Sequence, residues 1–402
     1  MKSRIITSVI ACLFIGGSLP AQTWKAKAIS DLNKGEFAKV EQTISKLSEA
    51  EKGKHAWLID SLQAMMTRIR DDFRLSREEG KKLLLEKVPG ATDKQIEAWK
   101  QKKYLETRII DGEERWFRKT ISNFTLLNRE LFTAEMIKDK KKEYAKLHTQ
   151  CENILSQPVG VNHTCDWKKV NASFFIEVPA DAVPAGEVIK AWLPYPFDNG
   201  RQRNFQLLST SSPATHSDGS LHHTVYMEQK AVKGQPTRFE MKFSYEVGAQ
   251  VFSQEEILKN LKPYDKQSDL YQKYTVQELP HMLVNKQMKA LAQKIVGGET
   301  NPVLQASMIY DWISANYPWA GAIDYSTIPC MPQYVLDIHH GDCGQVTLLY
   351  ISMLRSLGIP ARWESGWVFD ETGWTGYHDW GEIYFEGTGW VPTDVSAGRD
   401  TY

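Results

Sequence analysis

Cys343 stands where a thiol can gain reactivity, because it opens a predicted helix. After the run Gly341-Asp342-Cys343-Gly344-Gln345-Val346, apolar residues recur every three or four positions, which predicts a helix with one buried face. Asp342 can cap the start of this helix, and Gly358 and Pro360 can end it. The first turn of a helix offers unpaired N–H groups and the positive dipole end, which stabilise a thiolate and can later hydrogen-bond an oxyanion.

Two downstream residues can complete a nucleophilic site around this thiol. His378 begins a predicted strand that turns at residues 386–389 and returns toward Asp394. In such a hairpin the two side chains come within reach if the register permits. An Asp beside a His orients the ring and stabilises its charged form, and a His facing a thiol accepts its proton. Asp379 is a poorer third member, because neighbouring strand residues point to opposite faces.

Other residues near Cys343 in the sequence make weaker candidates. His339 and His340 have no comparably placed carboxylate, and the pair lacks further ligands at zinc-like spacing, so we expect neither metal nor cofactor. Gln345 or Trp319 can be suggested as a donor to the oxyanion, with little in the sequence to support either.

The N-terminus has the pattern of an export signal over residues 1–21. Lys2 and Arg4 precede a short apolar stretch, and Ala21 offers a small residue before a cut. Cys12 lies in a segment that resembles a lipoprotein cleavage box, but the apolar residues after it make lipid attachment the less favoured alternative. No later segment is apolar enough to span a membrane, so we expect a periplasmic or extracellular protein without an integral membrane span.

Cysteine pairing is the structural alternative to catalysis. An exported chain meets oxidising conditions, so pairing must be considered for the four cysteines that follow the signal. Cys151 and Cys165 could close a ring worth about 3 kcal/mol. A bond between Cys330 and Cys343 would block any chemistry at Cys343.

The remaining sequence predicts an α+β protein of several domains. We expect a helical region over 22–160, a β-sandwich-like domain over 161–265 and a mixed domain over 280–402. The predicted helices lie at about 37–47, 55–70, 285–296 and 303–316, and a helix capped by Thr92 or Asp93 follows a turn at Pro89-Gly90. A linker is expected at 262–265 and a long loop at 317–340, and strands are expected at about 361–369, 379–385 and 390–395.

Four motifs resemble the transglutaminase-like superfamily, which is built on the papain-like plan. They are Gly341-Asp342-Cys343-Gly344, Leu357-Gly358-Ile359-Pro360-Ala361-Arg362, His378-Asp379-Trp380 and Gly389-Trp390-Val391-Pro392-Thr393-Asp394. The resemblance covers residues 280–402 and implies Cys343 as nucleophile, His378 as general base and acid, and Asp394 as the orienting residue. In that family more strands normally follow the last motif, so either the sequence is truncated, which we expect, or this copy of the domain is impaired.

The resemblance implies an exported cysteine enzyme that forms a thioester with a peptide or carboxamide acyl group. Its substrates would be peptide, protein or cell-wall amides, with hydrolysis favoured over cross-linking. The alternative is a non-catalytic envelope protein that binds peptide or glycan. Lys plus Arg and Asp plus Glu number 49 each, and a neutral chain without a basic run is a poor candidate for nucleic-acid binding.

Overall fold

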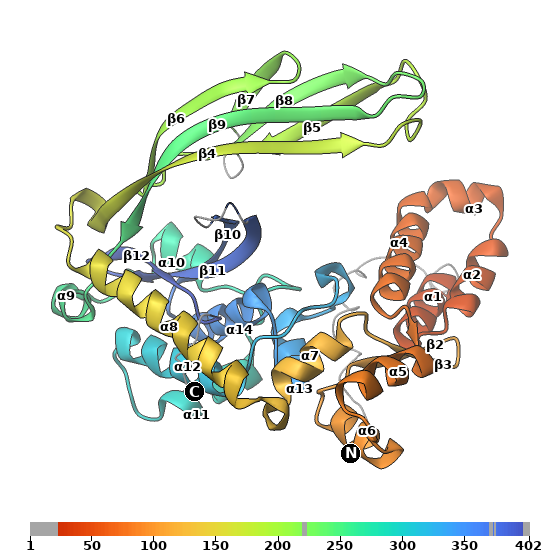
Figure 1. The fold of residues 1–402 in the computed structure, drawn as a ribbon, viewed down its shortest axis with the longest axis horizontal. Coiled ribbons are helices and arrows are strands. Elements are labelled where there is room, and N and C mark those ends of the chain that lie inside the picture. The colour runs from red at the N-terminus through yellow and green to blue at the C-terminus, as the bar shows by residue number, and fades with distance from the viewer. Residues whose placement is uncertain (1–22, 219–222, 370–372, 374, 397–402) are drawn as a thin grey trace. The chain divides into compact units, whose positions relative to one another are not determined.

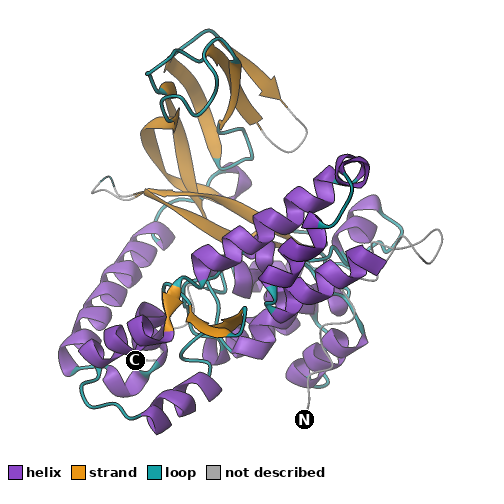
Figure 2. Cartoon of the chain, turned by 90° about the vertical axis from the view of Figure 1, so that its right-hand side faces the viewer, coloured by secondary structure: helices purple, strands orange, loops and turns teal. Residues whose placement is uncertain are grey.

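A computed structural model describes residues 23–218, 223–369, 373 and 375–396. The predicted export signal therefore lies outside the described residues. The chain forms two compact units: residues through Lys138 join those from Gln254 onward in the larger one, and Asp139–Ser253 form the smaller one (Figure 1). Figure 2 shows that helices dominate the larger unit and strands the smaller one. Within the described parts of the chain, we find no helix with the length and apolar character needed to cross a bilayer.

The N-terminal part of the larger unit is mainly helical, as predicted. Its helices are α1 (Thr23–Lys34), α2 (Phe37–Ser45), α3 (Glu49–Lys54), α4 (Ala56–Asp72), α5 (Arg77–Lys87), α6 (Asp93–Gln101), α7 (Thr120–Leu127), the 3₁₀ turn η2 (Arg129–Leu131) and α8 (Ala134–Leu155), which runs on past Lys138. The Thr92 hydroxyl caps α6 and Gln95 completes the capping box, which confirms the predicted helix start.

A small antiparallel sheet in this region was not anticipated. Strands β1 (Leu75–Ser76), β2 (Thr107–Ile110) and β3 (Glu113–Trp116) pair in the order β1-β3-β2. Strands of two to four residues are too short to show an alternating pattern, so no local pattern predicts them. Trp116 is fully buried among Leu84, Trp99 and Phe124, and it anchors the sheet to the helices.

The smaller unit is a β-sandwich-like body, as predicted. After the turn η3 (Val161–His163), its strands are β4 (Thr164–Val178), β5 (Val188–Pro194), β6 (Gln202–Thr210), β7 (Ala214–Asp218), β8 (His223–Lys230) and β9 (Thr237–Gln250). They form two antiparallel sheets, β4-β9-β6 and β5-β8-β7. One apolar core, which includes Leu193, Met227 and Phe239, joins residues from both sheets.

The C-terminal part of the larger unit mixes helices with one three-stranded sheet. Its elements are α9 (Gln254–Asn260), α10 (Asp269–Tyr274), α11 (Lys286–Val296), α12 (Pro302–Asn316), η4 (Tyr325–Thr327), α13 (Met331–Ile338), α14 (Cys343–Ser356), β10 (Ala361–Phe369), β11 (Thr375–Phe385) and β12 (Gly389–Thr393). The sheet is antiparallel in the order β10-β11-β12. The predicted helices and strands are confirmed here to within a few residues.

Two expectations for this part were wrong. The loop expected at 317–340 contains helix α13. Pro332 fits in the first turn of this helix because N–H groups there have no partner within the helix. The linker expected at 262–265 is packed against the sheet: Lys262 N donates to Glu386 O at 2.9 Å, and the Tyr264 hydroxyl donates to Tyr384 O at 2.9 Å. The segment that leads out of β9 therefore belongs to the folded body.

Helix α14 is the central element of this part. All its residues from Gly344 to Ser356 are buried, and it contacts α11, α12, α13, β10 and β11. It ends as predicted, because Gly358 adopts a positive φ of 80° that few residues other than glycine tolerate. The helix that presents Cys343 is thus held rigidly on every side.

Direct contacts join the two sequence-distant parts of the larger unit. Asn123 donates to Gly321 O at 2.8 Å and accepts from Gly321 N at 2.9 Å, both in buried positions. The partly buried Tyr334 hydroxyl donates to the Glu106 carboxyl group. Burial raises the pKa of Glu106 to about 7, and the hydrogen bond from Tyr334 acts in the opposite direction.

Candidate active site

The start of α14 places Cys343 in the first helical turn. Asp342 Oδ1 accepts from Gln345 N at 3.1 Å, and Gln345 Oε1 accepts from Asp342 N at 3.1 Å. This reciprocal capping box confirms the predicted role of Asp342. The Gln345 side chain is buried, and its Oε1 accepts the capping hydrogen bond from Asp342 N. Its Nε2 has no hydrogen-bond partner among the described residues.

His378 reaches the nucleophile from the middle strand of the sheet. It faces Gly366 across the β10–β11 pair, and the absence of a side chain on Gly366 leaves room for the Trp380 ring. That ring stacks on the imidazole of His378 with centroids 6.3 Å apart. Strand pairing and stacking together restrict the imidazole.

Asp394 follows β12 and meets His378 as the hairpin argument anticipated. His378 Nε2 lies 2.6 Å from Asp394 Oδ2. The other carboxylate oxygen of Asp394 accepts from Ser396 N at 3.0 Å and from the Ser396 hydroxyl at 2.6 Å. Burial opposes ionisation, but the hydrogen bonds from His378 and Ser396 outweigh it and lower the pKa of Asp394.

The other side of the imidazole faces Cys343. Hydrogen bonds to Asp394 and to Cys343 raise the pKa of His378 to about 10, although burial acts in the opposite direction. The structure therefore brings Cys343, His378 and Asp394 together, with the imidazole between the sulfur and the carboxylate. An imidazolium in this position can hold a thiolate beside it and supply a proton to a leaving group.

Asp379, expected to be a poorer third member than Asp394, lies beside the nucleophile. Cys343 Sγ donates to Asp379 Oδ2 at 3.7 Å, so a second carboxylate touches the thiol. Burial, together with the nearby charge of Asp342, raises the pKa of Asp379. The pairing of β11 with β12 ends at Gly381, and no described strand pairs with that edge of β11 beside His378 and Asp379.

Tyr325 forms the third side of the site. Its hydroxyl donates to Asp342 Oδ1, and burial raises its pKa. A Cβ at position 344 would collide with this hydroxyl and would lie 2.6 Å from Asp379 Oδ2. The glycine after the nucleophile is thus required by close packing. No pattern in the sequence marked Tyr325.

The remaining candidates lie apart from this arrangement. The ring of His339 stacks on Tyr317. His340 is buried, and burial lowers its pKa to about 4, so it is a neutral core residue. The Trp319 side chain is half-exposed, and its backbone bridges to Gly341.

Neither a disulfide nor a cluster of metal ligands occurs among the described residues. Cys151, Cys165, Cys330 and Cys343 are all free thiols, so neither suggested disulfide is formed. Within those residues, His, Cys, Asp and Glu side chains form no group of three or more suited to a metal ion.

The fold and the site together define a class of protein. In this class a cysteine at the start of a helix lies beside an antiparallel sheet that carries a histidine and an aspartate. Residues 289–395 match the model of the transglutaminase-like superfamily. This part of the chain is therefore a transglutaminase-like domain, as the sequence motifs indicated.

Two curated relatives share part of the sequence. An uncharacterized protein of Haemophilus influenzae is 27% identical over 167 residues, which cover 33% of this chain and 43% of that protein. The uncharacterized protein YebA of Bacillus subtilis is 26% identical over 139 residues, which cover 30% of this chain and 19% of YebA. The match spans less than half the length of either relative.

Solved structures share a more distant similarity. A candidate cysteine protease from Cytophaga hutchinsonii is 18% identical with a TM-score of 0.43, over 57% of this chain and 76% of that one. The periplasmic domain of TgpA from Pseudomonas aeruginosa is 15% identical with a TM-score of 0.29, over 57% of this chain and 74% of that one.

Proposed function

We propose that this chain is an exported cysteine enzyme that cleaves peptide or carboxamide bonds through a Cys343–His378–Asp394 triad. The observation that carries the proposal is the imidazole of His378, which lies 2.6 Å from Asp394 Oδ2 and whose pKa is raised by both Asp394 and Cys343. The transglutaminase-like match over residues 289–395 supports the general kind of enzyme. The charged and apolar pattern of residues 1–21 supports export.

The reaction proceeds in two halves. The Cys343 thiolate attacks the carbonyl carbon, and backbone N–H groups in the first turn of α14 donate to the oxyanion. As the C–N bond breaks, His378 passes its proton to the leaving amine, and a thioester remains on Cys343. His378 then takes a proton from water, the hydroxide attacks the thioester, and the carboxylic acid leaves as the thiol is restored.

Hydrolysis is favoured over transfer to a second amine because water can reach the thioester. Cys343, His378 and Asp394 are each only partly buried. Exclusion of water is what lets an enzyme of this chemistry favour an amine acceptor. A partly open site therefore supports hydrolysis of peptide, protein or cell-wall amides.

Incubation of peptide and cell-wall amides with the wild type and with Cys343→Ala, followed by mass spectrometry, tests the proposal. We expect new carboxylic acid and amine products with the wild type and none with Cys343→Ala. Cys330→Ala is the matched control, because Cys330 is a free, half-buried thiol outside the triad, and it should retain the activity. Binding of the same compounds without any product in either enzyme would favour the non-catalytic alternative.

A further inference from the structure

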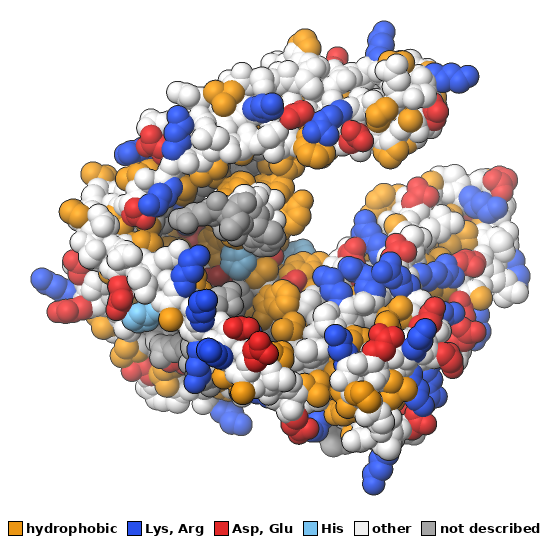
Figure 3. All heavy atoms as spheres, viewed as in Figure 1, with side chains coloured by type: hydrophobic (Ala, Val, Ile, Leu, Met, Phe, Trp, Pro, Cys, Tyr) orange, Lys and Arg blue, Asp and Glu red, His pale blue; other side chains and the backbone are white. Residues whose placement is uncertain are grey.

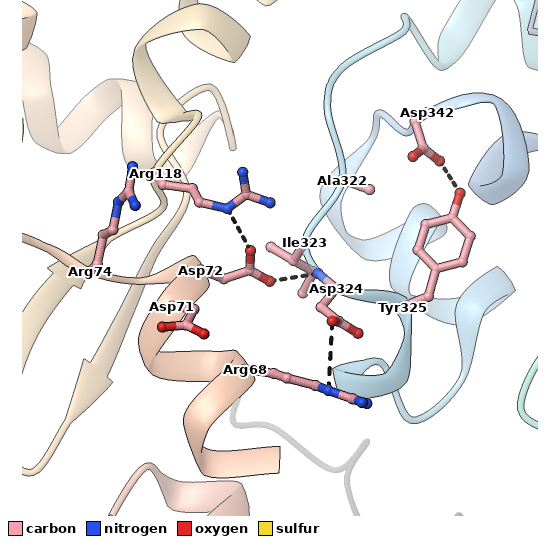
Figure 4. A pocket seen from close by; sticks show the side chains of 10 residues that line it. All are labelled: Arg68, Asp71, Asp72, Arg74, Arg118, Ala322, Ile323, Asp324, Tyr325 and Asp342. Carbon is pink, nitrogen blue, oxygen red and sulfur yellow. Dashed lines mark hydrogen bonds and ion pairs between the residues drawn. The ribbon is translucent and has the colours of Figure 1, made fainter. Parts of the chain in front are cut away.

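A cleft of about 570 Å³ opens beside the candidate nucleophile in the larger unit (Figure 4). One wall comes from the N-terminal helical part, at the end of α4 and at Arg118. The other wall comes from residues 322–325 and Asp342. The N-terminal part thus contributes directly to the surroundings of the transglutaminase-like core.

The cleft reaches the residues on either side of Cys343. Asp342 precedes the nucleophile directly and lines the cleft. Tyr325 also lines it, donates to Asp342 and lies against Gly344. The cleft therefore borders the residues that flank Cys343.

A buried carboxylate fixes one cation in the cleft. Asp72 is 3% exposed, its Oδ1 accepts from Arg118 Nε at 3.0 Å, and its Oδ2 accepts from Asp324 N at 2.5 Å. Only the Nε edge of Arg118 is used, and neither terminal nitrogen has an ion pair or hydrogen bond with a described residue. The guanidinium is oriented while its terminal donors remain available.

A second cation, Arg74, is unpaired. Its side chain is exposed and lines the same wall, and it has no ion pair or hydrogen bond with any residue that the structure describes. In Figure 4, Arg74 and Arg118 lie on one side of the cleft, and Asp342 and Tyr325 lie on the other. Figure 3 shows that Lys and Arg side chains gather on this face of the larger unit, with Asp and Glu among them.

Most acidic groups in the cleft already have partners. Asp72 binds Arg118, Asp324 accepts from Ser326 N at 2.9 Å, and Asp342 accepts from Tyr325. Asp71 is the acidic lining residue without an ion pair to a described residue. Arg74 and the terminal nitrogens of Arg118 therefore remain available to a ligand, and Asp71 is the acidic lining residue that competes for them.

We propose that Arg74 and Arg118 bind a carboxylate of the substrate, so that the enzyme prefers short peptides with a free carboxyl end near the cleaved amide. This inference rests on the proposed function, because it assigns the substrate class of the same site. Guanidinium groups bind carboxylates through paired, charge-assisted hydrogen bonds, which a C-terminal amide cannot replace.

The test compares N-acetylated tripeptides supplied as free acids and as C-terminal amides. We expect the wild type to favour the acid by about tenfold in kcat/KM, as for one well-placed charged pair. Arg74→Ala should reduce this ratio toward one and keep its fold, because Arg74 is exposed and unpaired. Arg77→Ala is the matched control, since Arg77 lies outside the cleft lining, and it should keep the wild-type ratio.

Arg118 needs a conservative variant because it neutralises the buried Asp72. Arg118→Lys keeps a positive charge but loses the paired geometry, and it should also lower the acid preference. Equal cleavage of acid and amide by the wild type, or an unchanged ratio in both arginine variants, overturns the carboxylate site and leaves the nucleophile intact.

A binding measurement separates this inference from the proposed function. If no tripeptide is cleaved, the proposed hydrolysis fails, and binding of the labelled acid and amide to Cys343→Ala decides the carboxylate site. Tighter binding of the acid that is lost in Arg74→Ala supports the site, and equal binding of the two forms contradicts it.

Discussion

His378 keeps its proton through the neutral range because its ring interacts with both Asp394 and Cys343. Its pKa of about 10 lies far above the ordinary value near 6.5. The protonated ring thus stabilises the folded state fully below about pH 6.5, and this contribution is lost as the pH rises through about 10. The contribution of Asp394 to folding stability depends on pH in the opposite direction. Because the pKa of Asp394 is lowered in the folded protein, this contribution is lost only as the pH falls.

Asp394→Asn should move the titration of His378 down toward the ordinary histidine value. The substitution keeps the shape of the side chain but removes the charge that holds the proton. Titration of the His378 ring signals by NMR measures the pKa, and thermal unfolding should show a larger loss for the variant at pH 6 than above pH 10. A histidine that titrates near 10 in both proteins would contradict this role of Asp394.

At this scale the sequence indicated three residues that meet in space, because motif spacing and hairpin geometry both pointed to them. Asp379 and Tyr325 were beyond its reach. Alternation describes the direction of Cβ atoms in a paired strand, and Asp379 lies where β11 has lost its partner β12. Tyr325 reaches Asp342 through a 3₁₀ turn in a region expected to be a loop.

The next scale is that of helix α14, whose capping box holds the position of Cys343. Asp342→Ala removes the acceptor for Gln345 N, and we expect it to lower the free energy of unfolding by about 1 kcal/mol. It should also change the alkylation rate of Cys343 by iodoacetamide, since the first turn frays. Urea unfolding and timed alkylation measure the two effects.

Ser76→Ala provides the matched control for this prediction. Ser76 caps α5 through the same type of capping box, in the same compact unit but away from the nucleophile. It should cost a similar free energy and leave alkylation of Cys343 unchanged. If the two variants alter alkylation equally, the cap of α14 has no special role in positioning the thiol.

Several long elements were predictable, and the shortest ones were not. Helices α2 and α11 carry a full apolar face, and the hydrophobic period identifies such a face. The strands β1, β2 and β3 have two to four residues each, and their pairing depends on Trp116 meeting partners far away in the sequence. Whether such short segments form strands depends on tertiary packing, which no local sequence pattern encodes.

At the scale of the whole molecule, the larger unit is assembled from both ends of the described chain. Asn123 makes the clearest contact between the two ends, because both the N–H and the C=O of its side-chain amide are hydrogen-bonded to Gly321 in a buried position. The sequence boundaries suggested separate helical and catalytic regions. Contacts between residues some 200 apart in sequence leave no local trace, so this union was not visible in advance.

Asn123→Ala should loosen both parts of the larger unit together. It leaves the N–H and C=O of Gly321 unpaired in a buried position, at roughly 1–3 kcal/mol for each group. Hydrogen exchange followed by mass spectrometry should show reduced protection in residues 56–127 and in 302–356, with residues 164–250 unchanged. Reduced protection in 56–127 alone would show that the two parts do not unfold as one unit.

The central claim is that Cys343 forms a covalent acyl intermediate, and the most direct measurement is the mass of this residue during turnover. Wild-type enzyme mixed with a cleaved peptide amide is quenched in acid, digested and analysed for the peptide that contains Cys343. The account predicts an added mass equal to the acyl part of the substrate, on Cys343 and not on Cys330, that is released by hydroxylamine. Product formation by Cys343→Ala at the wild-type rate, or turnover with acyl groups on another residue, would contradict it.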